Sequence, residues 1–309
     1  MDRYDVIIIG GGAAGLSAAL VLTRTRRSIA VVDAGAPRNG PATHLHGYLS
    51  RDGMAPTGLL RAGRREVQGY GGTLIAGTVT EVGLDGPGFT ALLDGGQQIS
   101  ARQMVVTTGL RDELPDIPGL RSRWARDVLH CPYCHGYEVS GCQLGVLGGT
   151  PGSVRYAQIV RQWSDDLVYF TPPDVLTATE RSELRARAIG IVEGTVDELV
   201  IDSDDRLRGL RMRDGCVIPR VALFVPPRFV PNSHLLVDLG CDADSSGWVQ
   251  VDSAGRTSVP GVWAAGNIVD PRAQVITAAG AGSATAIALN ADLVDVDVRN
   301  AVHRHALVR

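Results

Sequence analysis

Aromatic residues are scarce in this chain. Phe, Trp and Tyr make up 5% of its 309 residues, whereas 44% are hydrophobic and 38 are glycine. A chain poor in aromatic residues but rich in glycine and small aliphatic residues is typical of an α/β protein with closely packed backbones. Its length predicts about two domains, and its apolar content is sufficient for a substantial core.

Long apolar runs and an excess of charge are also missing. No run reaches the roughly 20 apolar residues that span a bilayer, and the start Met-Asp-Arg-Tyr-Asp is unlike a secretory signal. The formal net charge of −3 favours neither nucleic acid nor an anionic membrane. We therefore expect a cytoplasmic protein with no nucleic-acid or membrane partner.

Cysteine is scarce too, with five residues in the chain. An odd number argues against a framework of structural disulfides. Only Cys131 and Cys134 stand in a recognisable spacing, and Cys142, Cys216 and Cys241 are isolated. A zinc site needs about four ligands. The sequence therefore predicts no metal site, and the C-x-x-C pair indicates either a redox dithiol or two inert core cysteines, of which we favour the first.

The first forty residues contain a nucleotide-binding pattern. A β-branched run, Tyr4–Ile9, leads into Gly10, Gly12 and Gly15, and an apolar helix and a second strand ending at Asp33 follow. In such a motif the first glycine permits the tight turn, the second lets a pyrophosphate approach the backbone, and the third lets the helix pack on the strand. Asp33 is placed to accept hydrogen bonds from ribose hydroxyls. A plain glycine-rich turn is the alternative.

A second, altered copy of this pattern begins near residue 143. A strand at Leu144–Leu147 precedes the loop Gly148–Ser153, a helix at 154–160 and a strand at Leu167–Phe170. Between the two copies, residues 76–99 alternate as a β-meander. Proline-containing linkers are expected at 115–118 and 226–232, and a strand at 262–264 and a helix at 276–293 follow. We expect one domain built from both ends of the chain, with a second inserted between the linkers.

The segment Cys131-Pro132-Tyr133-Cys134 carries the chemistry. Two intervening residues let the two sulfurs meet across one turn, and a lowered pKa would make one of them a nucleophilic thiolate. His135 follows at once and is placed to move protons to or from the departing sulfur. Small glutaredoxin-like domains use a similar motif, but here it lies between two βαβ units.

Taken together, these motifs resemble the low-molecular-weight thioredoxin reductase family over nearly the whole chain. The resemblance rests on the first glycine loop, Thr107-Thr108-Gly109, the central C-x-x-C, and Trp263-Ala264-Ala265-Gly266 followed by Gln274 and Thr277-Ala278-Ala279-Gly280. It implies two Rossmann-like domains and FAD as the cofactor. It implies a discontinuous FAD-binding domain at 1–113 and 232–309, and a central domain like an NADPH domain at 114–231. A homodimer is implied as well.

The family assigns roles residue by residue. Cys134 faces the flavin, Cys131 exchanges with thiols, and His135 takes the place of the usual proton donor. The implied FAD contacts are Gly10, Gly12, Ala13, Ala14, Gly15, Asp33, Ala34, Arg38, His46, Val79, Thr108, Gly109, Gly266, Asn267, Gln274, Val275 and Thr277. A helix beginning near Val275 would point its positive end at the flavin.

Three departures from the family are informative. Asn267 and His135 stand where the family has aspartate, and the second loop has Thr150 and Ser153 at its third and sixth positions, with no arginine after the following strand. Cys-x-x-Cys-His-Gly-Tyr-Glu and Ala-Ala-Gly-Asn resemble the branch of dithiol oxidases that close disulfides in gliotoxin- and holomycin-type antibiotics. His44 and His46 also resemble that branch, where they would line the flavin edge. A polar loop with capping histidines is the other interpretation.

The predicted function is an FAD-dependent dithiol oxidase. A small-molecule dithiol would reduce the Cys131–Cys134 disulfide, the pair would reduce FAD, and oxygen would accept the electrons as peroxide, with His135 moving the protons. Two alternatives stay open: a thioredoxin reductase fed by NADPH or another donor, and a non-catalytic FAD redox sensor.

Overall fold

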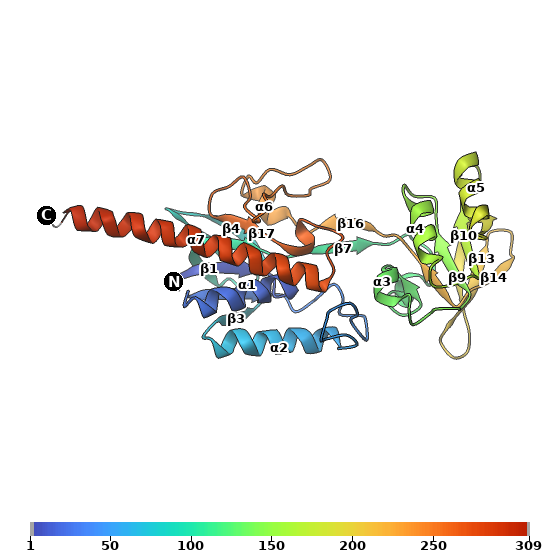
Figure 1. Ribbon diagram of the computed structural model, residues 1–309, viewed down its shortest axis with the longest axis horizontal. Coiled ribbons are helices and arrows are strands. Elements are labelled where there is room, and N and C mark those ends of the chain that lie inside the picture. Colours follow the sequence, from blue (N-terminus) through green and yellow to red (C-terminus); the bar gives the residue numbers. More distant parts are fainter. Residues whose placement is uncertain (1–2, 308–309) are drawn as a thin grey trace. The chain divides into compact units, whose positions relative to one another are not determined.

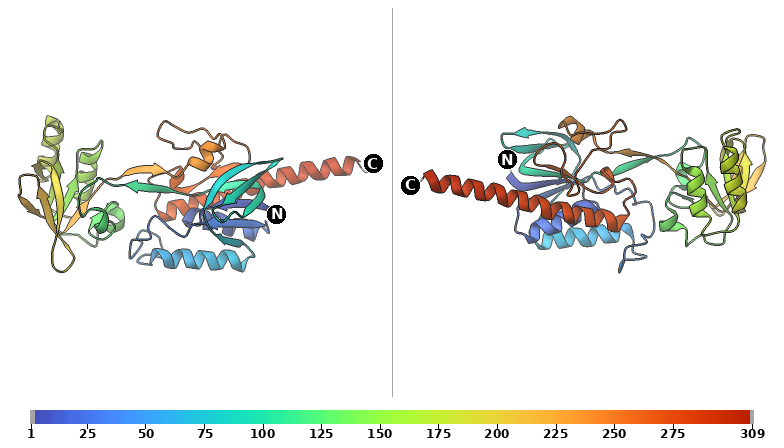
Figure 2. Two further views of the ribbon diagram at one scale, coloured as in Figure 1. Left: turned by 180° about the vertical axis from the view of Figure 1, so that it is seen from behind. Right: turned by 45° about the horizontal axis from the view of Figure 1, so that its top comes forward.

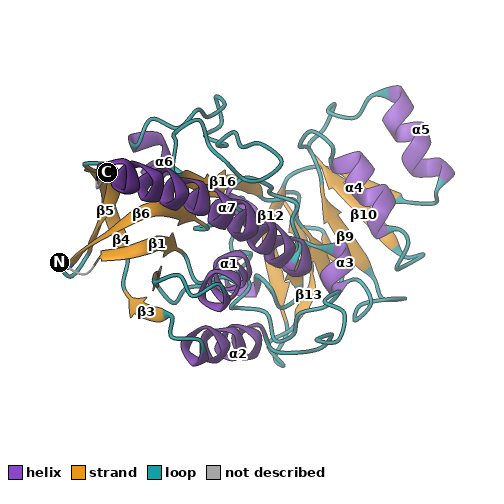
Figure 3. Cartoon of the chain, turned by 60° about the vertical axis from the view of Figure 1, so that its left-hand side comes forward, coloured by secondary structure: helices purple, strands orange, loops and turns teal. Residues whose placement is uncertain are grey.

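The computed structural model describes residues 3–307, and contacts divide the chain into two compact units. Unit 1 comprises residues 1–40, 47–111 and 229–309, and unit 2 comprises 41–46 and 112–228. Figure 1 labels the elements of both, and Figure 3 distinguishes helices from strands. The mixed α/β fold, with parallel strands in both units, agrees with the predicted fold class.

Unit 1 is built on a seven-stranded sheet in the order β3-β2-β1-β6-β5-β4, with β17 paired to β6. Strands β1, β2, β3, β6 and β17 run parallel, and β4, β5 and β6 form the expected antiparallel meander. The strands are β1 (Arg3–Ile9), β2 (Ile29–Asp33), β3 (Thr73–Ala76), β4 (Val79–Asp85), β5 (Gly88–Leu93), β6 (Gln98–Val106) and β17 (Val262–Ala264).

Both faces of this sheet are covered, so β1 is apolar on each side. Ile7 and Ile9 belong to one buried cluster, and Val6 and Ile8 to the other, as the alternation of side chains along a strand requires. Helices α1 (Ala13–Arg24), α2 (Pro56–Gly69) and α7 (Val275–Leu307) pack together, as the two views in Figure 2 also show. Helix α6 (His234–Asp238) and the 3-10 turn η2 (Gly266–Ile268) complete the unit.

Helices α1 and α7 cross at very short range. A side chain at Gly282 would place its Cβ 2.0 Å from the carbonyl oxygen of Ala14, so only glycine fits there. Helix α7 begins one residue before the expected helix and extends 14 residues beyond its predicted end at 293, because apolar periodicity fades while helix-forming residues continue. Its exposed final turns carry Val294, Val298 and Val302.

Unit 2 contains a five-stranded parallel sheet in the order β11-β10-β9-β15-β8 and a three-stranded antiparallel sheet, β12-β13-β14. The first sheet comprises β8 (Val128–Leu129), β9 (Leu144–Leu147), β10 (Leu167–Thr171), β11 (Gly190–Glu193) and β15 (Ala222–Phe224). The second comprises β12 (Val196–Ile201), β13 (Leu207–Met212) and β14 (Val217–Pro219). The helices are η1 (Arg121–Arg123), α3 (Pro132–His135), α4 (Ser153–Val160) and α5 (Ala178–Ala186).

Strands lie directly before the first segment expected as a linker and within the second. Strand β7 (Leu110–Glu113) precedes the first proline-rich stretch, and β16 (Arg228–Pro231) lies within the second. The two strands pair with each other as a separate two-stranded sheet. Pro231 ends its strand, where a missing N–H is tolerated. The linker prediction was therefore incomplete, because this pairing joins segments more than 110 residues apart and leaves no local pattern.

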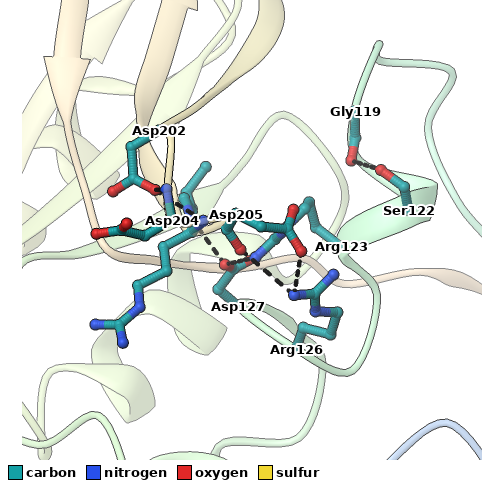
Figure 4. A network of polar contacts seen from close by, with 10 residues as sticks. Gly119, Ser122, Arg123, Arg126, Asp127, Asp202, Asp204 and Asp205 are labelled. Carbon is teal, nitrogen blue, oxygen red and sulfur yellow. Dashed lines mark hydrogen bonds and ion pairs between the residues drawn. The ribbon is translucent and has the colours of Figure 1, made fainter.

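A buried arginine anchors the start of unit 2. Arg123 is 3% exposed, and its guanidinium pairs with Asp127 and, at 2.7 Å, with Asp205 (Figure 4). Arg126 also contacts Asp205 at 2.6 Å, and Asp127 accepts a hydrogen bond from the backbone N–H of Leu207 at 2.9 Å. The hydrogen bond from Arg123 to Asp127 raises the pKa of Arg123. Because the charge is paired and fully hydrogen-bonded, this network fixes β13 against the segment before β8.

Candidate functional site

The cysteine pair forms a disulfide at the start of α3. Cys131 and Cys134 are bonded through their sulfurs, and their Cα atoms lie 5.2 Å apart. The N–H groups of Cys134 and His135 both donate to the carbonyl of Cys131 at 3.1 Å. Pro132 suits the first turn of a helix, where its missing N–H would have no partner. The segment thus holds the two sulfurs together on one short turn, and both cysteines are partly exposed.

Unit 2 holds this turn in place with aromatic side chains. A Cβ at Gly136 would lie 2.7 Å from the ring of Trp163, so the chain approaches the indole as closely as glycine allows. Tyr133, between the two cysteines, meets Trp163 edge to face with ring centroids 5.7 Å apart. The hydroxyl of partly buried Tyr156 donates to the carbonyl of His130, and burial raises the pKa of Tyr156. The redox turn is therefore clamped from α4 and from the loop after it.

His135 lies beside the disulfide in a partly buried setting. Burial lowers the pKa of its imidazole, while the nearby Glu138 carboxylate raises it and His46 lowers it. Near neutral pH these effects leave His135 mainly uncharged, the form in which an imidazole can accept a proton. His46 Nε2 lies 3.3 Å from Glu138 Oε1, so this residue, expected among the FAD contacts, pairs within unit 2.

The first glycine loop is tight where it meets the protein and open where a ligand would lie. Gly10 has φ +103°, and a Cβ at Gly15 would lie 1.9 Å from the carbonyl oxygen of Gly10. Thr107 donates its hydroxyl to that same carbonyl at 2.7 Å. A Cβ at Gly12, by contrast, would meet no protein atom within 4 Å. Gly12 is also the N-cap of α1, with no side chain capping the helix, so the loop fits the pyrophosphate of a dinucleotide.

Asp33 lies over this loop at the end of β2. A Cβ at Gly11 would come within 2.8 Å of its carboxylate, so the second glycine of the run makes room for the acid. Arg64 of α2 binds the carboxylate at 2.5 Å. Asp33 is thus held on the loop, one oxygen engaged by the guanidinium, where it can accept from a ribose.

The late turn after β17 closes on the same helix. Gly266 has φ +81°, and a Cβ there would lie 2.9 Å from that of Ala14. The amide of Asn267 donates to the carbonyls of Asp270 and Ala273, both at 2.9 Å. This brings Gly266, Ala14 and the N-terminal end of α7 together. Asn267, which replaces the usual aspartate, fixes the loop that leads into α7.

The other predicted cofactor residues lie around these loops or behind them. Thr108 donates to the carbonyl of Asn232 at 2.8 Å and accepts from its amide at 2.9 Å through its own carbonyl. Arg38 stacks over Phe229 at 5.1 Å. Val79 is 4% exposed within the core.

The remaining predicted cofactor residues lie at the starts of helices or in loops. Ala13 and Ala14 begin α1, and Val275 and Thr277 lie in the first turn of α7. Ala34 follows β2 and is exposed, Gly109 has φ +67°, and Gln274 lies beside Gly47.

The second glycine loop is filled by the protein itself. The hydroxyl of Tyr169, a residue 1% exposed, accepts the N–H of Gly149 at 3.2 Å and contacts Ser153 Oγ at 2.7 Å. Ser153 in turn donates to the carbonyl of Thr150 at 2.5 Å. A Cβ at Gly148 would lie 2.1 Å from the tyrosine ring. Loop donors and space that would serve a phosphate are thus used internally, and Pro151 has no N–H to offer.

Two arginines, Arg155 of α4 and Arg187 just after α5, line a cavity with Gly152 at the end of this loop. Arg181 of α5 pairs with Glu193 at 2.5 Å, and Arg185 lies on the same exposed helix. The residues just after β10 include Asp174, which is exposed and has φ +58°. The position where a 2′-phosphate would need a cation therefore carries an acid.

Four residues of these sites were missed from the sequence: Arg64, Thr107 as the anchor of Gly10, Glu138 as the partner of His46, and Tyr169 in the second loop. Arg64 gave no signal, since an arginine on an amphipathic helix is ordinary. Glu138 stood in the quoted motif, three residues after His135, but its partner lies 92 residues earlier in the chain. Within residues 3–307 no group of three or more His, Cys, Asp or Glu is arranged to hold a metal ion. Nor does any helix in that range have the length and apolar character to cross a membrane.

Comparisons with known proteins agree with this arrangement. Residues 4–283 match the family "Pyridine nucleotide-disulphide oxidoreductase". Thioredoxin reductase sirT of Leptosphaeria maculans is 28% identical over 96% of both chains, and thioredoxin reductase tcpT of Claviceps purpurea is 30% identical over 85% of this chain and 86% of its own. The crystal structure of HlmI is similar with a TM-score of 0.95 and 56% identity, covering 98% of this chain and 96% of that one. An oxidoreductase from Agrobacterium tumefaciens has a TM-score of 0.87 at 33% identity, covering 94% and 99%.

Proposed function

Because the chain belongs to the pyridine nucleotide-disulphide oxidoreductase family, we propose that it is a dithiol oxidase that closes a disulfide in a small-molecule natural product. At the coarser level the chain is a flavin-dependent thiol–disulfide oxidoreductase that uses FAD. In the proposal, residues 1–113 and 232–309 bind FAD and residues 114–231 carry the reactive pair. A cytoplasmic homodimer, expected from the sequence and the family resemblance, is part of the proposal.

The exchange at the cysteines takes two substrate thiols and leaves a disulfide. One substrate thiolate attacks Sγ of Cys131, forming a mixed disulfide and releasing Cys134 as a thiolate. The second substrate thiol, deprotonated, attacks its own partner sulfur and releases Cys131, so the product leaves oxidised and the pair keeps two electrons. His135 accepts and returns protons at the Cys134 side. When bound, FAD supplies the two-electron acceptor that restores the disulfide, and oxygen finally becomes hydrogen peroxide.

The residues proposed to hold FAD are those of the first loop and the late turn. Gly12 faces open space, Asp33 lies over the loop, and Gly266 leads to the start of α7. At Gly12 no protein atom lies within 4 Å of the position that a side chain would take. The positive ends of α1 and α7 favour a negatively charged pyrophosphate and the negative charge of a reduced flavin, respectively.

The observation that carries the oxidase proposal is the filled second loop. Tyr169, Ser153 and Thr150 satisfy one another where a nicotinamide dinucleotide would place its phosphates. Without an efficient nicotinamide donor, electrons have to enter through the cysteines. This reverses their direction relative to a thioredoxin reductase.

A thioredoxin reductase is the second candidate, favoured by the names of the relatives sirT and tcpT. One aerobic experiment separates the candidates. The purified yellow protein is mixed with a small dithiol, with and without NADPH, and oxygen uptake and peroxide are recorded. The proposal expects one peroxide per dithiol oxidised without NADPH. Activity only with NADPH and thioredoxin would assign the reductase, and no turnover with any dithiol would assign the redox sensor.

A further inference from the structure

Residues 41–46 leave unit 1 and pack with unit 2, although the chain on both sides of them belongs to unit 1. This excursion, which we call the histidine segment, brings His46 Nε2 to 3.3 Å from Glu138 Oε1. The rings of His44 and His46 are 6.3 Å apart. The carboxylate of Glu138 belongs to the stretch just after α3, three residues beyond His135. The pair of Glu138 and His46 therefore lies at the stretch that directly follows Cys134 and His135.

These groups differ in their access to water. Burial has the largest effect on the pKa of His135 and lowers it. The side chain of His46 is 23% exposed and that of Glu138 is 45% exposed. The charged groups that act on His135 are Glu138, from the stretch after α3, and His46, from the histidine segment, and they act with opposite sign. The arrangement therefore runs from a partly buried base to a solvent-exposed acid.

We propose that Glu138 and His46 are positioning residues that pass protons between His135 and solvent while the Cys131–Cys134 disulfide opens and closes. The inference rests on the dithiol chemistry proposed above. Neither residue touches the reacting sulfurs in this proposal, and both act through His135. The histidine segment would then take part in the chemistry of unit 2 and would not serve only as a connection within the chain.

The proton balance shows why such a pair is needed. When the disulfide opens, the attacking substrate thiol gives its proton to His135, the new S–S bond forms at Cys131, and Cys134 leaves as a thiolate with the bonding electron pair. Before His135 can accept another proton, it has to release this one to solvent. A partly buried imidazole exchanges protons with water slowly unless a hydrogen-bonding group connects it to the surface. Glu138, paired with His46 and half exposed, is placed to be that group.

The first test measures His135 directly, without turnover. Imidazole NMR signals of the oxidised, FAD-loaded protein are titrated with pH, and His135 is assigned by comparison with His135→Gln. Removing the carboxylate in Glu138→Gln should lower the pKa of His135, whereas His46→Gln should raise it, because the two neighbours act with opposite sign. Glu183→Gln, an exposed acid on α5, is the matched control and should leave the titration unchanged.

The second test measures proton delivery. Reduction of the FAD-loaded protein by dithiothreitol is followed anaerobically by stopped flow from about pH 5 to about pH 9. This range includes the ordinary pKa of histidine. Glu138→Gln should slow reduction about tenfold at neutral pH, less than the roughly 10²–10⁴ of a group that transfers the proton itself. Its acid limb should move to lower pH. Glu138→Asp, which keeps the charge, should recover most of the rate and also shows that the turn folds.

The results that overturn the inference are distinct from those that overturn the oxidase. Wild-type pH profiles in both Glu138→Gln and His46→Gln, or shifts of His135 in the same direction, would refute the proton path. Equal loss in Glu183→Gln would refute it as well. Absence of peroxide with oxygen would refute the oxidase alone, because reduction by dithiothreitol and the NMR titration do not depend on the final acceptor.

Discussion

The loops that follow β1 and β9 occupy equivalent places in their two units and have similar glycine-rich sequences, yet they present opposite surfaces. At Gly12 the first loop faces space free of protein atoms, and at the equivalent Thr150 the second loop gives its carbonyl to Ser153. The difference arises one strand away, because β10 supplies Tyr169 to the second loop whereas β2 supplies Asp33 to the first. A glycine-rich strand–loop–helix is therefore a binding site only if the neighbouring strand leaves it empty.

The largest expected effect tests whether the unit with the filled loop performs the chemistry. Cys131→Ser and Cys134→Ser should each abolish dithiol oxidation, since one sulfur cannot cycle between disulfide and dithiol. Cys131→Ser should retain Cys134 as a thiolate against oxidised flavin and show a long-wavelength charge-transfer band. Cys134→Ser should lack that band in the same absorbance measurement. Bands of equal strength in the two variants would contradict the assignment of Cys134 to the flavin and of Cys131 to thiol exchange.

The next effect compares equivalent positions of the two loops. Gly12→Val should weaken FAD binding by about a hundredfold, equal to ~2.7 kcal/mol, because its side chain enters the open space while meeting no protein atom. Thr150→Val is the matched control and should keep the full flavin content, since Thr150 is exposed and lies in unit 2, outside the residues proposed to bind FAD. The ratio of flavin to protein absorbance after purification measures both. A yellow Gly12→Val protein would contradict the placement of FAD.

The difference between the loops also predicts poor reduction by NADPH. Two missing charge-assisted hydrogen bonds of about 1.5–3 kcal/mol each weaken binding by roughly 10²–10⁴, and Asp174 repels the 2′-phosphate. Anaerobic stopped-flow mixing should show slow or absent flavin bleaching with micromolar NADPH and rapid bleaching with a dithiol. NADH avoids the phosphate term but meets the same filled loop. Fast bleaching by NADPH would restore the reductase.

The smallest effect concerns the tyrosine that fills the second loop. Tyr169→Phe removes the hydroxyl that binds Gly149 and Ser153, and should lower the free energy of unfolding by about 1–3 kcal/mol because the N–H of Gly149 loses its acceptor and the buried Oγ of Ser153 loses its donor. Tyr70→Phe, at an exposed tyrosine of unit 1, should change it by no more than about 0.5 kcal/mol. Urea unfolding measures both variants. Equal stability of Tyr169→Phe and the wild type would show that the loop does not need this hydroxyl.

Many features of the two loops and their units were predictable from the sequence, because each depends on residues that are close together in the chain. The βαβ order, the meander, both glycine loops and the C-x-x-C turn each occupy a few consecutive residues and have a fixed spacing. The defects at Thr150 and Pro151 were visible in the same way. What fills the second loop was not visible, since Tyr169 reads as an ordinary apolar strand residue.

The remaining features depend on pairs that are distant in the sequence. Arg64 meets Asp33, β7 meets β16, and His46 meets Glu138 only after the chain has folded, and none of these pairs leaves a periodic trace. The histidine segment is the clearest case. In the sequence, its two histidines could line the flavin edge or belong to a polar loop. Their position in unit 2, where His46 pairs with Glu138, adds a role in proton transfer as a third interpretation.

The pairing of β17 with β6 has a consequence for how the protein is made. Unit 2 consists of one continuous stretch, 112–228, plus six residues that precede it, so its chain is complete on the ribosome before residue 229 is added. The sheet of unit 1 waits for β17, and α1 gains its cover only when α7 emerges. Since domains fold as units during synthesis, the disulfide-bearing unit can fold while the first glycine loop still lacks its late turn. During translation the unit that carries the cysteine pair can therefore fold before the residues proposed to bind FAD are complete.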